Sequence, residues 1–242
     1  MKNGRQNLLS NNGFNTMKII DAHSHIDYIT HKLQPNVVGT ICCTTDESQW
    51  ATLIDMMGKD KCIYGAFGIH PWFVDSVDDG FDLRLENLLK ANSNYMIGEI
   101  GLDKYKPDIQ KQIDVFIKQL DIAVKYNRSV FLHCVGAWDK VLHILKQYKN
   151  LPIIVAHAFN GNDKILQQLL CYENIMFSFN KIDMCNGNCC IEQIPDDKIL
   201  VESDGKKDLN LNQLIKQITD IKANNDMPNI IYKNTQRVID NG

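Results

Sequence analysis

The chain lacks any long apolar run, and it also lacks an excess of positive charge. None of its 242 residues belongs to an unbroken hydrophobic stretch of about 18 residues, the length that a membrane-spanning helix needs. The 26 Lys and Arg side chains stand against 29 Asp and Glu, a formal net charge of −3. Proteins that bind duplex nucleic acid by general electrostatics are usually basic. We therefore expect no membrane partner and no unselective binding of long duplex DNA.

Two common nucleotide-binding motifs are also missing. The sequence contains neither GxGxxG nor GxxxxGK[ST], so a dinucleotide-binding fold or a P-loop has no support. The 8 cysteines form no CxxC pair, and in a chain of this length without a signal peptide they predict free thiols rather than a disulfide framework. Cys185, Cys189 and Cys190 lie close together and could hold a soft metal, but a cysteine-rich loop is the favoured interpretation.

The first 16 residues differ in composition from the rest. They are polar and rich in Asn, with no apolar stretch of the length that a secretory signal requires. They predict a disordered leader over 1–16, with Met17 as an alternative start, and a cytoplasmic protein. Residues 17–242 show no change in composition and predict a single domain.

After residue 16, short apolar segments alternate with longer amphipathic ones. The alternation predicts eight parallel strands with helices between them, repeating about every 25 residues. Such a repeat at this length favours an α/β fold of the (β/α)8 TIM-barrel type over an open doubly wound sheet. The expected strands are 18–25, 37–44, 62–70, 95–103, 129–134, 152–159, 175–180 and 199–204. The expected helices are 46–59, 81–92, 108–126, 138–148, 163–172, 211–224 and 228–240.

Five of the 7 histidines fall at or near the ends of these strands, where parallel-barrel enzymes hold their catalytic groups. They are His23, His25, His70, His133 and His157, and the acids Glu99, Glu202 and Asp204 share this placement. Residues i and i+2 of a strand point to the same face, so His23 and His25 should lie together, as should Glu202 and Asp204. One histidine alone on a strand is more often a hydrogen-bonded core residue. Several histidines and acids at the ends of different strands together predict a metal site.

Several motifs, taken in their order along the chain, resemble those of the TatD family of metal-dependent hydrolases. DAHSHID (21–27), GIHPW (68–72) and IGEIGLD (97–103) resemble the family's first three signatures, and the helix from Gln110 resembles the one that follows. LHC (132–134), AHAFNG (156–161) and VESD (201–204) resemble its last three. The resemblance covers nearly the whole chain after residue 17 and implies an amidohydrolase-like TIM barrel that hydrolyses ester bonds.

The resemblance also implies a role for each matching residue. His23, His25 and Asp204 would hold one divalent ion, His133 and His157 a second, and Glu99 would bind both. His70 would contact a substrate phosphate or a water, and Asp204 would accept the proton of a water activated by two ions (Zn, Mg or Mn). Glu202 would orient a ligand, although a buried acid paired with a lysine is an equal alternative. The implied activity is that of a deoxyribonuclease acting on DNA ends.

Two departures from the family pattern leave the substrate open. Val135 stands where many members carry an Arg. The eighth-strand motif usually reads Glu-Thr-Asp with a Pro shortly after it, whereas here Gly205 and Lys206 follow Glu-Ser-Asp. The loss of the Arg cation weakens the case for a large polyanionic substrate. A related two-metal hydrolase of a small phosphoester, lactone or cyclic amide therefore stays an alternative, as does an inactive metal-binding partner protein. The sequence indicates no obligate protein partner.

Overall fold

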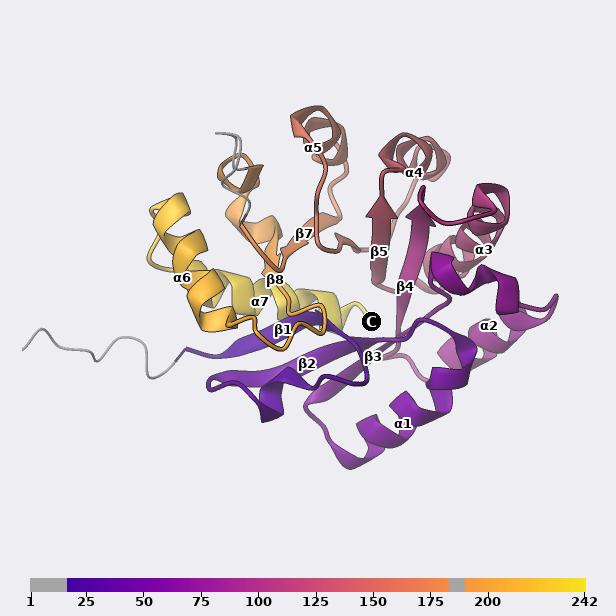
Figure 1. The fold of residues 1–242 in the computed structure, drawn as a ribbon, viewed down its shortest axis with the longest axis horizontal. Helices are drawn as coiled ribbons and strands as arrows, with labels where there is room; N and C mark the ends of the chain where they lie inside the picture. The colour runs from indigo at the N-terminus through magenta and orange to yellow at the C-terminus, as the bar shows by residue number, and fades with distance from the viewer. Residues whose placement is uncertain (1–16, 183–189) are drawn as a thin grey trace, which may run out of the picture.

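Eight parallel strands pair in chain order and curve into a nearly closed barrel, with helices on its outside (Figure 1). The structure is a computed structural model that describes residues 17–182 and 190–242. The strands are β1 (Ile19–Ser24), β2 (Val37–Cys43), β3 (Ile63–Phe67), β4 (Met96–Asp103), β5 (Val130–Val135), β6 (Ile154–Ala156), β7 (Ile175–Phe179) and β8 (Ile199–Val201). The predicted α/β fold of the (β/α)8 type is confirmed.

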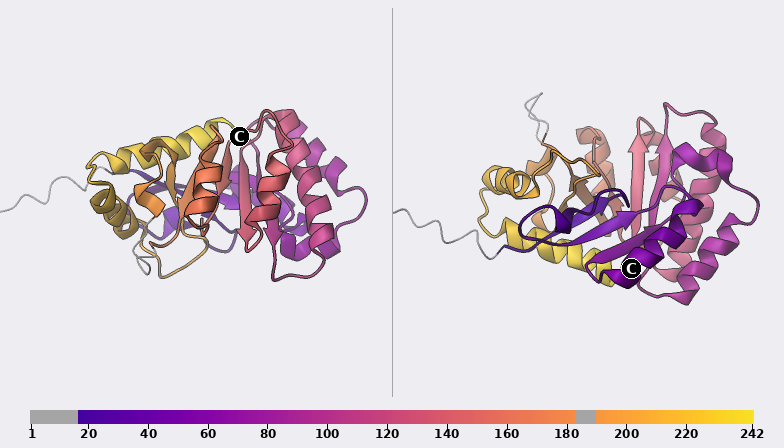
Figure 2. Two further views of the ribbon diagram at one scale, coloured as in Figure 1. Left: turned by 90° about the horizontal axis from the view of Figure 1, so that it is seen from above. Right: turned by 60° about the horizontal axis from the view of Figure 1, so that its bottom comes forward.

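The helices that cover the barrel match the amphipathic segments of the sequence. They are α1 (Trp50–Lys59), α2 (Phe81–Ala91), α3 (Ile109–Tyr126), α4 (Trp138–Leu145), α5 (Asp163–Leu169), α6 (Leu211–Lys222) and α7 (Met227–Asp240). In both views of Figure 2 they lie outside the strands, and α7 packs against β1 and β8. Among the described residues no helix is both long and apolar enough to cross a membrane.

The apolar side chains of the strands form two separate layers. One layer fills the barrel interior and includes Ile20, Ile41, Met96 and Phe131. The other lies between the strands and the helices, where β4 residues such as Ile97 pack with α3 residues such as Phe116. Strands that are buried on both faces explain why their sequences are apolar throughout rather than alternating.

Several strands are shorter than the sequence predicts. The third ends at Phe67, the sixth at Ala156 and the eighth at Val201, so His70, His157 and Asp204 lie in the segments that follow them. The expectation that Glu202 and Asp204 share a strand face is therefore wrong, because neither residue lies in the strand. After Val201 the main chain turns, and Asp204 adopts a left-handed conformation with φ of 53°.

The barrel closes between its first and last strands through the segment that follows β8. The backbone N–H of Asp204 donates to the carbonyl of His23 at 3.0 Å, and the N–H of Ser203 donates to Oδ1 of Asp21 at 2.8 Å. These bonds connect distant segments of the chain, and the Ser203–Asp21 bond joins residues 182 positions apart. They hold the end of β8 beside the residues of β1 that carry the histidines.

The leader lies wholly outside the described residues, and the cysteine cluster lies partly outside them. The leader 1–16, Cys185 and Cys189 are outside them, so the predictions for these segments stay untested. The cysteines whose side chains are described, Cys42, Cys43, Cys62, Cys134 and Cys171, are free thiols, in agreement with the expectation from composition.

Candidate metal centre

The predicted site residues come together at the end of the barrel where the strands finish. Glu99 on β4 lies at the centre of the cluster, and the five histidines surround its carboxylate. Glu99 is buried, with 2% of its surface exposed, whereas His25 is partly open to solvent. The cluster therefore has a closed base and an accessible side, as a binding site requires.

An irregularity in β1 turns His23 into the barrel. Ile20 and Ala22 lie in the interior layer, so a regular strand would place His23 on the opposite face. Between two successive residue pairs, β1 advances three residues, from Asp21 to Ser24, whereas β2 advances only two, from Thr40 to Cys42. This extra residue is a β-bulge, which redirects the side chains beyond it. The His23 ring consequently lies 5.9 Å from Phe131 and 4.0 Å from His157, between centroids.

A second irregularity places Glu99 in the same way. Ile97 and Ile100 both belong to the outer layer, although regular alternation would put residues three apart on opposite faces. Between two successive residue pairs, β4 advances three residues, from Ile97 to Ile100, whereas β5 advances only two, from Val130 to Leu132. The residue added between them leaves Glu99 facing the histidines. Both bulges occur within the strands that carry the site, where bulges are over-represented in proteins.

The two oxygens of Glu99 face different groups of histidines. Its Oε1 lies 2.7 Å from His133 Nδ1, 3.2 Å from His157 Nε2 and 3.4 Å from His70 Nε2. Its Oε2 lies 3.3 Å from His23 Nε2 and 3.8 Å from His25 Nε2. A carboxylate in this position can present one oxygen to each of two separate sets of nitrogen donors.

Asp204 completes the side of the cluster that holds the paired histidines. Its Oδ1 lies 3.6 Å from His25 Nε2 and 3.9 Å from His23 Nε2. Its Oδ2 accepts a hydrogen bond from the Asn180 amide and contacts Lys206 Nζ, each at 3.2 Å. One carboxylate oxygen therefore faces the imidazoles while the other is held by neighbouring side chains.

Glu202 lies behind His157 and orients its ring. Glu202 Oε1 lies 2.9 Å from His157 Nδ1 and accepts the backbone N–H of Ala158 at 3.0 Å. Its Oε2 accepts a hydrogen bond from the Ser178 hydroxyl. With both carboxylate oxygens acting as acceptors, the proton of the imidazole is placed on Nδ1 and Nε2 is directed at Glu99. A histidine held in this way is typical of metal ligands.

His70 has the opposite arrangement of its ring nitrogens. Its Nδ1 accepts a hydrogen bond from the backbone N–H of Trp72 at 3.1 Å, so the proton of the neutral ring is on Nε2. That nitrogen points to Glu99 Oε1 at 3.4 Å and acts as a donor. His70 is therefore suited to donate a hydrogen bond, unlike the other four imidazoles, which can offer a lone pair.

Buried ring nitrogens without hydrogen-bond partners are concentrated in the cluster. Among the described residues, both ring nitrogens of His23 and Nε2 of His133 are buried without a hydrogen bond of good geometry. Buried polar groups nearly always have partners, so such a concentration within one site needs an explanation. Three sets have donor atoms within 4.8 Å of one another: His23 with His157 and Asp204, His23 with His25 and Glu99, and His70 with Glu99 and His133. Imidazole and carboxylate donors suit zinc and similar divalent ions.

The electrostatics of the site also favour bound positive charge. Burial opposes ionisation of Glu99, but the charges of His157, His23 and His70 hold its pKa well below the usual range. Burial, with the charge of His157, lowers the pKa of His23, which keeps its lone pairs unprotonated. Burial opposes protonation of His157, yet the charges of Glu202 and Glu99 raise its pKa well above the usual value. An ionised Glu99 and an unprotonated His23 are the states that a metal ion requires, whereas a cation bound at His157 would have to displace its Nε2 proton.

Asp103, Asn180 and Lys206 also belong to the site, and the sequence analysis did not assign them to it. Asp103 is the last residue of β4, is buried, and lies 3.8 Å from His133 Nε2 through its Oδ2. Asn180 and Lys206 contact Asp204. Asp103 and Asn180 directly end or follow strands, the same signal that identified the histidines, so extending that rule to all polar residues would have found them.

Buried glutamines of α3 hold the loops that carry the site. Gln119 accepts the N–H of Ile69 at 2.7 Å and donates to its carbonyl at 3.1 Å, next to His70. Gln112 does the same at the end of β4, accepting the N–H of Asp103 at 2.8 Å and donating to its carbonyl at 3.2 Å. Each glutamine side chain thus provides hydrogen bonds to a backbone N–H and carbonyl that have no partner in a neighbouring strand.

Trp72 and Trp138, which lie in the segments after β3 and β5, have different environments. Trp138 is buried and donates from Nε1 to Asn160 at 3.1 Å, so it acts as a packing residue. Trp72 is 53% exposed and donates from Nε1 to Oδ2 of Asp103 at 2.7 Å. Only Trp72 of this pair presents an open aromatic surface beside the cluster.

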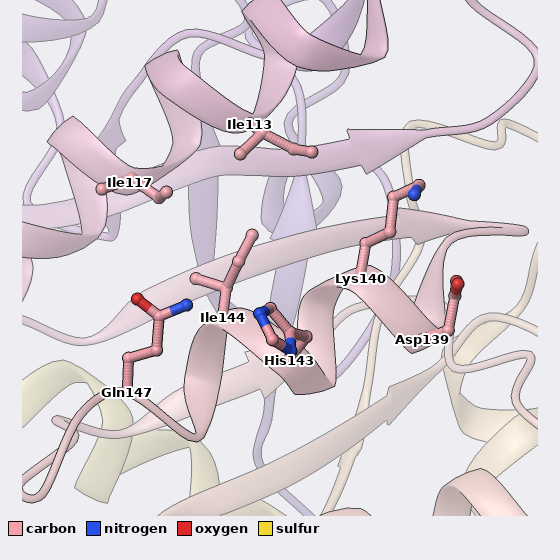
Figure 3. A pocket seen from close by; sticks show the side chains of 7 residues that line it. All are labelled: Ile113, Ile117, Asp139, Lys140, His143, Ile144 and Gln147. Carbon is pink, nitrogen blue, oxygen red and sulfur yellow. The ribbon is translucent and has the colours of Figure 1, made fainter.

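A pocket of about 410 Å³ on the outer surface is separate from this centre. Figure 3 shows Ile113 and Ile117 of α3 facing Ile144 of α4, with His143 and Lys140 along the same helix. The pocket shares no residue with the metal-type cluster. It has no group of converging polar side chains comparable to the barrel mouth, and we assign it no chemistry.

Comparison with known proteins agrees with the geometry. The sequence profile of the family described as TatD related DNase matches residues 20–240. The human 3'-5' RNA nuclease TATDN2 is 28% identical over 214 residues, which are 76% of this chain and 28% of that protein. The 3'-5' ssDNA/RNA exonuclease TatD of Pectobacterium atrosepticum is 31% identical over 168 residues, 65% of this chain and 63% of its own length. These matches therefore span between 28% and 63% of these curated relatives.

Solved structures support the barrel architecture. The TatD homologue YjjV from Escherichia coli superposes with a TM-score of 0.81 at 20% identity, covering 91% of this chain and 97% of that one. A TatD family hydrolase from Entamoeba histolytica superposes with a TM-score of 0.79 at 17% identity, covering 92% and 98%. The profile match covers nearly all of the described residues. The chain belongs to the TatD related DNase family.

Proposed function

We propose that this protein is a metal-dependent hydrolase of phosphodiester bonds that acts as a nuclease on single-stranded nucleic acid. The observation that carries the proposal is the division of the Glu99 carboxylate between two sets of imidazoles, in which three buried nitrogens lack partners. The relatives named as nucleases of RNA or single-stranded DNA support the choice of substrate.

We assign two divalent cations to these residues in the distribution that the family resemblance implies. The set of His23, His25 and Glu99, whose donor atoms lie within 4.8 Å of one another, supports the first of these ions. His23, His25 and Asp204 would hold one ion, His133 and His157 the other, and Glu99 would bind both. Divalent ions bound there would polarise phosphoryl oxygens and make a bound water more acidic. Zinc, magnesium and manganese are all compatible with the mixed nitrogen and oxygen donors.

The protein's own side chains would orient the reactants and move the proton. Burial opposes ionisation of Asp204, but the hydrogen bond from His25 and the charges of His157 and His23 hold its pKa below the usual value. Its carboxylate is therefore ionised at neutral pH and available to accept a proton at Oδ1. The Nε2 proton of His70 would donate to a phosphate oxygen, and Glu202 would keep His157 in one tautomer.

A small phosphoester is a second candidate substrate. Val135 occupies the position where many family members carry an Arg, and its neighbour Gly136 adds no cation. The net charge of −3 also gives the chain little long-range attraction for a polyanion. The same centre could then cleave a monomeric diester, a lactone or a cyclic amide.

The test combines metal analysis with a substrate panel. Purified protein is analysed for bound metal, then incubated under Mg, Mn or Zn with single-stranded DNA, single-stranded RNA and a set of small phosphodiesters and lactones. The proposal expects near-stoichiometric metal and cleavage of the single strands. Glu99→Gln should lose both metal and activity. A wild-type protein with metal at trace level, or with metal but no hydrolysis of any substrate, would reject the proposal and favour a binding role.

A further inference from the structure

Trp72 forms an aromatic surface at the mouth of the metal-type cluster. It lies in the 3-10 helix Pro71–Ser76, directly after His70, and it is 53% exposed although tryptophan is usually well buried. Its ring centroid is 5.3 Å from that of His70, with the planes nearly perpendicular at 81°. An exposed indole next to the residue suited to contact a phosphate has a position that packing alone does not require.

The indole is held in a single orientation. Its Nε1 donates to Oδ2 of Asp103 at 2.7 Å, and Asp103 is fixed by Gln112 and lies beside His133. A rigid aromatic ring loses little conformational entropy when a ligand stacks on it. The ring is therefore preorganised for a flat partner.

A cation accompanies the ring. The ammonium group of Lys106, from the segment after β4, lies over the indole at 3.9 Å from the ring centroid. The ammonium covers one face of the indole, so a base would stack on that face only after the flexible Lys106 side chain swings aside. A nucleotide carries its phosphate one sugar away from its base, and the displaced ammonium would remain within reach of that phosphate. Stacking on aromatic side chains and contact with cationic ones are the two interactions by which proteins bind single strands without reading sequence.

We propose that Trp72 and Lys106 form a nucleotide subsite that stacks a base of the single strand and pairs with an adjacent phosphate, next to the bond being cut. The inference deepens the proposed nuclease function and rests on it for the identity of the cleaved bond. It assigns to this chain a single-stranded polynucleotide rather than a monomeric ester. The subsite supplies binding energy through the base, which substitutes for the cation absent at Val135.

The test measures affinity rather than activity. Fluorescently labelled single-stranded phosphorothioate oligonucleotides, which resist cleavage, are titrated with the protein as purified. One member is intact, and the others carry a single abasic nucleotide at one of the last three positions. Base–aromatic stacking predicts that one abasic position weakens binding to the wild type about 5- to 100-fold. Trp72→Leu should weaken binding of the intact strand similarly and remove this discrimination.

Two further variants separate stacking from positioning. Trp72→Phe keeps an aromatic face but loses the Nε1 donor to Asp103, so it should retain most of the affinity. Lys106→Gln should weaken all strands alike and reduce the salt dependence by about one phosphate contact. Lys216→Gln, which removes an exposed lysine from α6, is the matched control and should leave affinity unchanged. Thermal melting of each variant confirms folding.

The outcomes are distinguishable from those of the nuclease test. Equal binding of intact and abasic strands by the wild type, or no binding at all, overturns the subsite even if hydrolysis occurs. Equal losses for Trp72→Phe and Trp72→Leu also overturn it, because the ring would then act only through Asp103. Base-dependent binding without hydrolysis supports the subsite and rejects the proposed reaction.

Discussion

Glu202 Oε1 lies 2.9 Å from Nδ1 of His157, on the opposite side of the imidazole from Glu99, which is 3.2 Å from Nε2. The ring is thus held between two buried carboxylates that have different tasks. Glu202 fixes the tautomer, and Glu99 shares the cation that the ring would bind. The two carboxylates raise the pKa of this imidazole, so a cation bound at Nε2 would replace a proton there.

Glu202→Gln is expected to weaken metal binding about 10- to 100-fold while the protein stays folded. The amide can donate as well as accept, so it no longer specifies the Nδ1 proton of His157. Metal affinity is measured by competition with a chromogenic chelator. Glu173→Gln, an exposed residue, is the matched control. Equal affinities for Glu202→Gln and wild type would show that Glu202 is only a core acid.

His70→Ala and His25→Ala should affect different properties. His70 uses Nδ1 as an acceptor and carries its proton on Nε2, so its removal should reduce turnover and leave metal content close to that of the wild type. His25→Ala removes a lone pair facing Glu99 and Asp204, so metal content should fall along with activity. Both are measured by metal analysis and steady-state kinetics. Loss of metal in His70→Ala would contradict the donor role.

Removal of metal is expected to lower thermal stability. A ligand that binds only the folded state at about 100 times its Kd contributes about 2.7 kcal/mol. For a chain of this size that corresponds to a fall in Tm of about 5–10 °C. The measurement compares melting of protein as purified, protein treated with chelator, and treated protein supplied again with metal. A Tm that does not change on treatment would argue against a bound ion.

Gln119→Leu should destabilise the fold and disturb the segment that carries His70. It removes two hydrogen bonds and leaves the buried N–H and carbonyl of Ile69 without their partner. The expected cost is about 2–4 kcal/mol of unfolding free energy. Urea denaturation measures it, with Gln110→Leu on the exposed face of α3 as control. Similar unfolding free energies for the two variants would show that this clamp contributes nothing.

Two glycine substitutions should have effects of opposite sign. Gly101 in β4 has φ of +146°, and a Cβ there would lie 1.9 Å from the carbonyl oxygen of His133. Gly101→Ala should therefore destabilise the protein by more than about 3 kcal/mol and displace the site. A Cβ added at Gly58 in α1 would have no atom within 4 Å, so Gly58→Ala should stabilise by about 0.5–1 kcal/mol. Denaturation curves decide both, and a stable Gly101→Ala variant would contradict the close approach.

Much of the architecture follows from local patterns in the chain. Apolar segments such as those at Ile63 and Ile175 are buried on both faces, and the 3.6-residue periodicity of α3 matches its buried side. The side chain of Asp46 accepts from the N–H of Ser48 at the start of the segment that leads into α1, and Pro228 lies in the first turn of α7. These features depend on interactions between residues close in sequence, which is why composition and spacing determine them.

The barrel, its succession of strands and helices, and the set of residues at its mouth can all be predicted from the residue pattern. How those residues face one another depends on contacts across the fold. Regular alternation would direct His23 and Glu99 away from the interior, and the bulges that turn them inward depend on pairing with β2 and β5. The position of Asp204 depends likewise on its bond to the backbone of His23 across the barrel closure. Register and closure arise from contacts between distant segments, which no local pattern encodes.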